Sequence, residues 1–167
     1  RDTTQSHDRC SVVEVMGRNA GYIALNTGIA VGALVTLIPE VPYDLERDVI
    51  AKMKATQKTG KQHFIIIIAE GVGHAQDLAN EIQSRTGIDS RATVLGHVQR
   101  GGSPTLRDRV TASRMGYHAV ELLRKGIYNR VVATKAESIV DYDISVALSM
   151  YKTIDTRLLD IGSTISI

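Results

Sequence analysis

Short apolar runs alternate along most of the chain with longer stretches in which apolar and polar residues are mixed. The runs are nearly continuous, which is typical of strands covered on both faces of a sheet. They predict strands at Ser11–Val15, Leu34–Ile38, Phe64–Ala69, Thr93–Leu95 and Arg130–Thr134. The mixed stretches predict helices at Gly21–Val31, Leu45–Thr56, Ala75–Thr86 and Arg107–Lys125. This alternation predicts an α/β fold in which helices sandwich a parallel sheet, a Rossmann-like arrangement of three layers.

The pattern weakens beyond about Val140, where it predicts one more helix over Ile144–Tyr151 and then a tail. Neither a repeat nor a linker interrupts the chain, and its 167 residues are 43% hydrophobic, enough for the core of one ordinary domain. We therefore expect a single α/β domain over residues 1–167.

Charge and cysteine content exclude several classes of protein. The 20 basic and 18 acidic residues are interspersed and give a net charge of +2, so no polybasic face predicts binding to nucleic acid or an anionic membrane. No apolar run approaches the roughly 20 residues of a membrane span. The single cysteine, Cys10, cannot form an intramolecular disulfide, which favours a reducing compartment. We expect a cytoplasmic protein.

Polar residues and glycines follow three of the predicted strands. Met16-Gly17-Arg18 follows the first, Glu70-Gly71 the third, and His97–Gly102 the fourth. Because ligands collect outside the carboxyl ends of parallel strands, these segments should converge on one crevice. Glycines let backbone amides approach an anion, and arginine adds a planar set of donors. The crevice is therefore predicted to bind a phosphorylated small molecule.

Three segments carry a family resemblance: Val15–Arg18, Ala69–Gly73 and Thr93–Pro104. In order and spacing they resemble the C-terminal half of bacterial ATP-dependent phosphofructokinases, and the opening Arg1–His7 and the later Thr153–Arg157 fit the same pattern. The resemblance implies the sugar-phosphate-binding half of a two-domain enzyme. That enzyme would phosphorylate fructose 6-phosphate to fructose 1,6-bisphosphate in glycolysis.

The resemblance also implies what this chain lacks. The glycine-rich nucleotide loop, the aspartate associated with Mg²⁺ and the general base belong to the N-terminal half in this family. ATP and Mg²⁺ would therefore bind outside these residues, and a start at Arg1 without an initiator Met fits a fragment. The tail, about residues 140–167, is expected to pack on the missing half.

Individual roles follow from the same resemblance. Arg18 is the expected catalytic residue, because its fixed positive charge would stabilise the phosphoryl group in the transition state. The other expected substrate contacts are Met16, Gly17, Glu70, His97, Val98, Gln99 and Arg100. Glu70 would accept hydrogen bonds from sugar hydroxyls, while His97 and Arg100 would contact the 6-phosphate.

Arg9 and Arg91 precede predicted strands, so they should project from the end of the sheet opposite the crevice. The family nevertheless uses the matching arginines to bind substrate phosphate. The resemblance accounts for this contrast, since it implies a homotetramer in which both arginines reach the active site of a neighbouring subunit.

The resemblance further predicts an allosteric site for ADP or phosphoenolpyruvate. Its expected residues are Arg1, Gly32, Ala33, Leu34, Thr59, Lys61, Gln62 and His63. Leu34 stands where the family has an acidic residue associated with effector-bound Mg²⁺, and Thr59 stands where it has a lysine. These two departures predict weak or altered regulation.

Two alternatives remain open at this point. The chain could be a non-catalytic phosphosugar-binding or regulatory module that keeps the crevice, or it could belong to a pyrophosphate-dependent relative. A glycine-rich loop in the sequence that precedes Arg1 would distinguish the kinase from the module.

Overall fold

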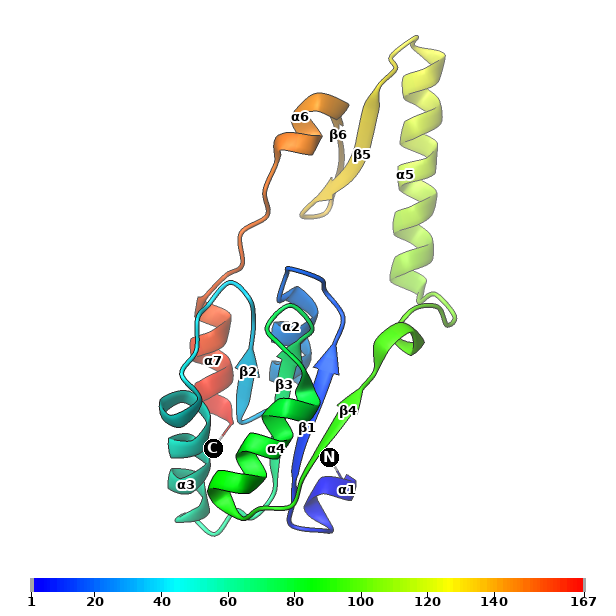
Figure 1. The fold of residues 1–167 in the computed structure, drawn as a ribbon. Coiled ribbons are helices and arrows are strands. Elements are labelled where there is room, and N and C mark those ends of the chain that lie inside the picture. The colour runs from blue at the N-terminus through cyan, green and yellow to red at the C-terminus, as the bar shows by residue number, and fades with distance from the viewer. Residues whose placement is uncertain (1, 167) are drawn as a thin grey trace. The chain divides into compact units, whose positions relative to one another are not determined.

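A computed structural model describes residues 2–166, which divide into two compact units (Figure 1). Unit 1 contains the chain up to Arg100 and again from Ile154 onward, and unit 2 is Gly101–Thr153. The expectation that residues 1–167 form one domain stays a prediction, and each unit is described by itself.

Unit 1 is built on a parallel sheet in the order β2-β3-β1-β4. Its strands are β1 (Cys10–Val15), β2 (Val35–Leu37), β3 (Phe64–Ala69) and β4 (Ser90–Val94). β1 pairs parallel with β3 on one side and with β4 on the other, and Cys10 lies opposite Phe64 and Ser90. β2 pairs parallel with β3. All residues of β3 are buried, as its unbroken apolar run predicts. The parallel sheet is thus confirmed.

Helices cover both faces of this sheet and complete the three layers (Figure 1). Met53 of α3 (Ala51–Gln57) and Ile82 of α4 (Ala75–Thr86) pack with Ile66 on one face. Ala24 of α2 (Tyr22–Val31) packs with Ile67 on the other face. A short π-helix, η1 (Leu45–Ile50), leads directly into α3, as the predicted helix over this stretch requires.

Three short elements of unit 1 were not expected from the sequence: α1 (Asp2–Gln5), the 3₁₀ turn η2 (Gly96–Gln99) and α7 (Arg157–Ile165). Helix α7 contacts α2 and β2, so the end of the chain packs on the sheet of unit 1. The expectation that the tail also contacts a missing half stays a prediction.

Unit 2 consists of α5 (Leu106–Arg124), β5 (Arg130–Lys135), β6 (Ser138–Asp143) and α6 (Ile144–Ser149). The expectation that β5 joins the parallel sheet is wrong, because β5 pairs antiparallel with β6. Only Ala136 and Glu137 separate the two strands, and so short a loop can connect only antiparallel strands. The pair lacks the Asn-Gly or Asp-Gly signature of such turns, which is why the hairpin was missed.

Unit 2 buries little apolar surface. In the described chain, Leu122 is its only contribution to the buried hydrophobic core. Large apolar side chains remain exposed on α5, on α6 and in the loop after α5, among them Leu106, Tyr117, Leu123, Tyr128, Val146 and Leu148. No helix within residues 2–166 is long and apolar enough to cross a membrane.

Candidate functional site

Hydrogen bonds join the carboxyl ends of β1 and β3. The Glu70 Oε1 atom, directly after β3, accepts the backbone N–H of Gly17 at 3.1 Å and that of Arg18 at 2.5 Å. Both donors belong to the turn that follows β1. One carboxylate thus fixes the turn that presents the expected catalytic arginine.

Gln99 adds the loop after β4 to the same edge of the sheet. Its Oε1 accepts the backbone N–H of Met16 at 3.1 Å, and its Nε2 donates to the carbonyl of Gly96 at 3.0 Å. The structure therefore brings together three of the sequence-predicted segments in one cluster. We call this set, Met16, Gly17, Arg18, Glu70 and Gln99, the strand-end cluster.

The backbone of this turn is unusual at two successive residues. Gly17 has φ of 151°, and a Cβ there would collide with the carbonyl of Ala20. The backbone of Arg18 lies in the left-handed region at φ 52°, which residues other than glycine rarely adopt. Strain of this kind persists only where surrounding contacts hold it, and it is concentrated at functional sites.

Gly71, which follows Glu70 just after β3, packs against the same turn. A Cβ at this position would collide with the carbonyl oxygen of Arg18. The obstacle is backbone rather than a flexible side chain, so a larger residue would displace the turn. The sequence places Gly71 in the segment that follows the third strand but predicts no separate role for it.

Charge in the cluster favours an ionised carboxylate beside free cations. The backbone N–H groups of Arg18 and Gly17 hold the pKa of Glu70 below its ordinary value, and the positive charges of Arg100 and Arg18 act in the same direction. Within residues 2–166 the guanidinium of Arg18 makes neither a hydrogen bond nor an ion pair, and it is exposed. An anionic ligand could therefore reach it without displacing a protein partner.

The remaining predicted contacts lie on η2 and just after it. His97 and Val98 are exposed, and the backbone N–H of Arg100 donates to the His97 carbonyl at 2.9 Å. The 3₁₀ turn thereby places His97 and Arg100 on one short loop beside the strand-end cluster. Gln99 was expected to supply connecting backbone, whereas the structure also gives its side chain a role in holding Met16.

Arg9 and Arg91 lie at the amino ends of β1 and β4, whereas the strand-end cluster lies at the carboxyl ends of the strands. Arg91 was expected to precede its strand but is the second residue of β4, because this edge strand starts earlier than its apolar run. The six residues of β1 separate the two ends of the sheet by about 20 Å. Within one chain, Arg9 precedes β1 and Arg91 lies opposite Ser11, whereas Arg18 follows the carboxyl end of β1.

The predicted effector residues gather at the amino ends of β2 and β3, which are neighbours in the sheet. Gly32 caps α2 in the left-handed conformation, while Ala33 and Leu34 are buried. Lys61 donates from Nζ to the carbonyl of Ser166 at 3.0 Å, and Thr59 donates from its hydroxyl to Thr56. Gln62 and His63 complete the loop before β3, and Arg1 lies outside the described residues. The effector site stays a prediction.

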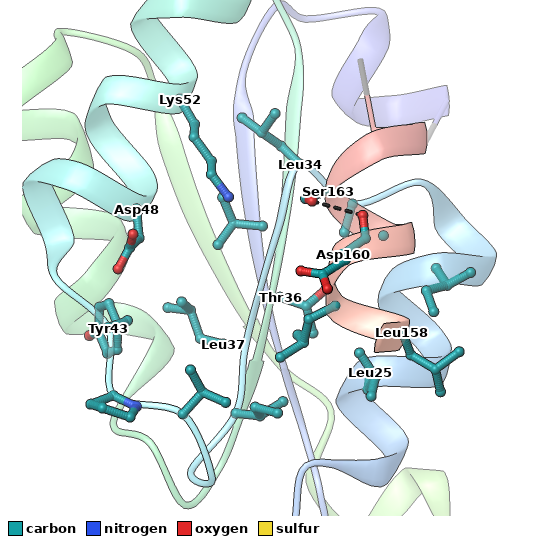
Figure 2. Close-up of a pocket in the computed structure, with 18 of the residues that line it drawn as sticks. Leu25, Leu34, Thr36, Leu37, Tyr43, Asp48, Lys52, Leu158, Asp160 and Ser163 are labelled. Atoms are coloured by element: carbon teal, nitrogen blue, oxygen red, sulfur yellow. Dashed lines mark hydrogen bonds between the residues drawn. The ribbon is translucent and has the colours of Figure 1, made fainter. Parts of the chain in front are cut away.

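A cavity of about 290 Å³ lies between β2, α2, η1, α3 and α7. Figure 2 shows residues that line it. Lys52 faces it from α3, and Asp160 and Ser163 face it from α7. Ala33 and Leu34 of the predicted effector set line it, whereas no residue of the strand-end cluster does. This cavity is therefore separate from the strand-end chemistry.

Metal and thiol chemistry have no support in the described part of the chain. Residues 2–166 contain no group of three or more His, Cys, Asp or Glu side chains that could hold a metal ion. Burial raises the pKa of the Cys10 thiol to about 12, against a smaller lowering by its hydrogen bond with Ser90. A thiol that stays protonated is a poor nucleophile, so Cys10 is a core residue.

Comparison with known proteins identifies the family of the chain and its fold. The family described as "Phosphofructokinase" matches residues 1–123. The chain belongs to the phosphofructokinase family. Its fold class, a parallel sheet flanked by helices, is that of solved phosphofructokinases.

Relatives of this phosphofructokinase chain are similar over its whole length. The ATP-dependent 6-phosphofructokinases of Clostridioides difficile (strain 630) and Bacillus thuringiensis (strain Al Hakam) are 50% and 52% identical to it over 167 residues. That alignment covers all of this chain and 52% of each relative, so the chain spans about half the length of these proteins. The solved phosphofructokinase of Saccharomyces cerevisiae superposes with a TM-score of 0.80 at 32% identity, over 88% of this chain and 21% of that one.

Proposed function

We propose that this chain is the sugar-phosphate-binding half of an ATP-dependent 6-phosphofructokinase. The observation that supports this most is the strand-end cluster, in which a strained arginine turn, a carboxylate and a glutamine from three separate segments are joined by hydrogen bonds. Fructose 6-phosphate is the proposed acceptor. ATP, with Mg²⁺, is the proposed donor and would be held by the other half of the longer polypeptide.

In this proposal Arg18 acts on the phosphoryl group during transfer. Phosphoryl transfer spreads negative charge over the equatorial oxygens, and a guanidinium fixed nearby stabilises that charge without a change of protonation. The hydrogen bonds from the turn to Glu70 fix the backbone from which Arg18 projects. Positioning of this kind places the charge before the reaction begins.

The remaining cluster residues bind and orient the sugar. Glu70 has a lowered pKa, so it is a carboxylate at neutral pH and accepts hydrogen bonds from sugar hydroxyls. Met16 and Gly17 lie beside the reacting hydroxyl. His97 and Arg100, on the exposed loop with Val98 and Gln99, bind the 6-phosphate of the sugar.

We further propose a cytoplasmic homotetramer with shared active sites. Arg9 precedes β1 and Arg91 lies opposite Ser11 near the same end of the sheet, whereas Arg18 follows the other end of β1, which supports their serving a neighbouring subunit. An ADP or phosphoenolpyruvate site at Arg1, Gly32–Leu34 and Thr59–His63 is part of this proposal, with regulation weakened by Leu34 and Thr59. The burial of Leu34 supports that weakening, because an apolar core side chain offers no ligand to an effector-bound metal.

The thin core of unit 2 supports the idea of a missing half. A segment with one buried core residue and many exposed large apolar side chains does not stabilise itself in water. We propose that these apolar faces pack against the part of the polypeptide that precedes this chain.

Turnover by the longer polypeptide tests the proposed function. With fructose 6-phosphate and Mg-ATP, the full-length protein should form fructose 1,6-bisphosphate, measured by a coupled aldolase assay. The chain of 167 residues alone should form none, because the donor site and general base lie outside it. A silent full-length protein would contradict the proposal, and activity with pyrophosphate in place of ATP would contradict the assigned donor.

Subunit mixing tests the shared site. Full-length Arg91→Ala and full-length Arg18→Ala are each expected to be nearly inactive, and mixed tetramers should regain part of the activity, because some sites contain neither change. Native mass spectrometry would verify that hybrid tetramers are present. Hybrid tetramers without recovered activity would rule out the sharing of sites between chains.

A further inference from the structure

Two arginines converge on one carboxylate at the amino end of the sheet. The Oδ2 atom of Asp89 lies 3.4 Å from Arg9 Nη2 and 3.5 Å from Arg91 Nε. We call Arg9, Asp89 and Arg91 the amino-end cluster. Within one chain it lies at the end of β1 opposite the strand-end cluster.

The backbone on which this cluster stands is fixed by the sheet. Cys10 N–H donates to the carbonyl of Asp89 at 2.9 Å, and Phe64 N–H donates to the carbonyl of Arg9 at 3.0 Å. Asp89 and Arg9 are therefore held on adjacent strands directly before the paired residues Cys10 and Ser90. The meeting of the three side chains is a consequence of sheet register rather than of a mobile loop.

The cluster keeps capacity for a further anion. Arg9 is mostly buried, with 16% of its side chain exposed, and its Nε has no hydrogen-bond partner within residues 2–166. A buried donor without a partner is costly, and a ligand oxygen would satisfy it. Arg91 is 65% exposed and Asp89 47%, so an anion has access from solvent to the Arg91 side of the cluster. The two arginines and one aspartate leave a net charge of +1.

We propose that Asp89 is an internal anion that competes with a ligand phosphate for Arg9 and Arg91, and so sets the phosphate affinity of this pair. The idea rests on the proposed function in one respect: the phosphate in question is that of the sugar substrate. Asp89 occupies the arginines when no phosphate is present. When a phosphate binds to Arg9 and Arg91, the negative charge of Asp89 repels it.

The geometry decides between this role and the alternative, in which Asp89 aids binding by aligning the guanidiniums. Ion pairs of 3.4 Å and 3.5 Å are longer than the 2.7–2.9 Å typical of charge-assisted hydrogen bonds, so Asp89 aligns the two guanidiniums only weakly. A dianionic phosphate on the same arginines would contact guanidiniums that also contact Asp89, so the two anions would be neighbours within the screening length of physiological salt, about 8 Å. Repulsion therefore outweighs the benefit of alignment.

The test replaces the charge of Asp89 and keeps its shape. In the full-length protein, Asp89→Asn should lower the half-saturating concentration of fructose 6-phosphate roughly three- to tenfold, because the repulsion is removed. Inorganic phosphate, titrated calorimetrically without nucleotide, should bind more tightly by a similar factor. In an Arg91→Ala background, followed by the phosphate titration alone, the same substitution should have a smaller effect, because one of the two contested cations is gone.

Glu81→Gln is the matched control. This substitution also removes one exposed carboxylate that pairs with an arginine, since Glu81 Oε2 lies 2.9 Å from Arg85 Nη2. Glu81 lies on α4, outside the amino-end cluster. The substitution should change neither measurement. An equal gain in both variants would indicate only a change of net charge and would overturn the proposal.

The two readouts separate failure of this inference from failure of the proposed function. Unchanged or weaker phosphate binding by Asp89→Asn, in an enzyme that turns over fructose 6-phosphate, overturns competition by Asp89 alone. If the full-length protein has no kinase activity, the inorganic phosphate titration still decides: tighter binding by Asp89→Asn supports the competing anion, and unaltered binding refutes it. Loss of affinity through misfolding cannot imitate the expected gain.

Discussion

Replacement of Arg18 by alanine in the full-length enzyme is expected to lower kcat by roughly 10² or more, with a smaller effect on the half-saturating concentration of fructose 6-phosphate. The charge on the transferred group develops in the transition state, so a guanidinium aimed at it contributes mainly to the rate of the chemical step. Steady-state kinetics over a range of both substrates, with single-turnover measurements of the chemical step, would separate the two parameters.

Arg85→Ala is a suitable control for this experiment. Arg85 is also an exposed arginine, but it pairs with Glu81 on the surface of α4, where ion pairs contribute little to stability or function. Its kinetics should match those of the unaltered enzyme. If Arg18→Ala changed only the affinity for substrate, Arg18 would be a binding residue and the catalytic role would be wrong.

Replacement of Gly71 by alanine should reduce activity by a comparable factor, about 10², although Gly71 contacts no substrate in our proposal. The new Cβ would collide with the carbonyl oxygen of Arg18, and because that atom is backbone, the whole arginine turn must move. A displacement of about 1 Å at a reacting centre is enough for a loss of this size. Overpacking should also lower the free energy of unfolding by about 1–3 kcal/mol.

Gly116→Ala provides the comparison for Gly71→Ala. Gly116 lies within α5, where a Cβ would have no heavy atom within 4 Å, so alanine should leave activity intact and favour the helix slightly. Thermal unfolding and kcat would be measured for both variants. Full activity in Gly71→Ala, with the turn shown undisplaced by a crystal structure, would show that the position of the turn does not control catalysis.

The sequence predicts unit 1 well because burial on both faces leaves a strong signal. The unbroken apolar run of β3 and the Gly87 cap of α4 are visible in the residues themselves. The start of β4 was missed because an edge strand tolerates polar residues such as Ser90 and Arg91. The hairpin of unit 2 was missed for a related reason, since β5 and β6 bury little surface and their turn lacks a glycine signature.

In the candidate site, too, the sequence predicts where some residues lie but not the contacts that they make. Arg18, Glu70 and Gln99 could be placed at one edge because parallel strands end together. The hydrogen bonds of the Glu70 carboxylate to the arginine turn depend on the left-handed conformation of Arg18, which no residue preference predicts. The meeting of Arg9 and Arg91 on Asp89 depends on the pairing of β1 with β4, which are far apart in the chain.

Unit 1 is assembled from two stretches of chain, and this has a consequence for the order of folding. The chain leaves unit 1 at Arg100 and returns at Ile154, an excursion of about 50 residues whose closure costs entropy before α7 can dock. During synthesis the sheet is complete well before α7 emerges from the ribosome. Until then the face of α2 and the edge strand β2 that α7 contacts stay uncovered. The nascent chain therefore exposes apolar surface for a time, and during that time chaperone binding competes with misassembly.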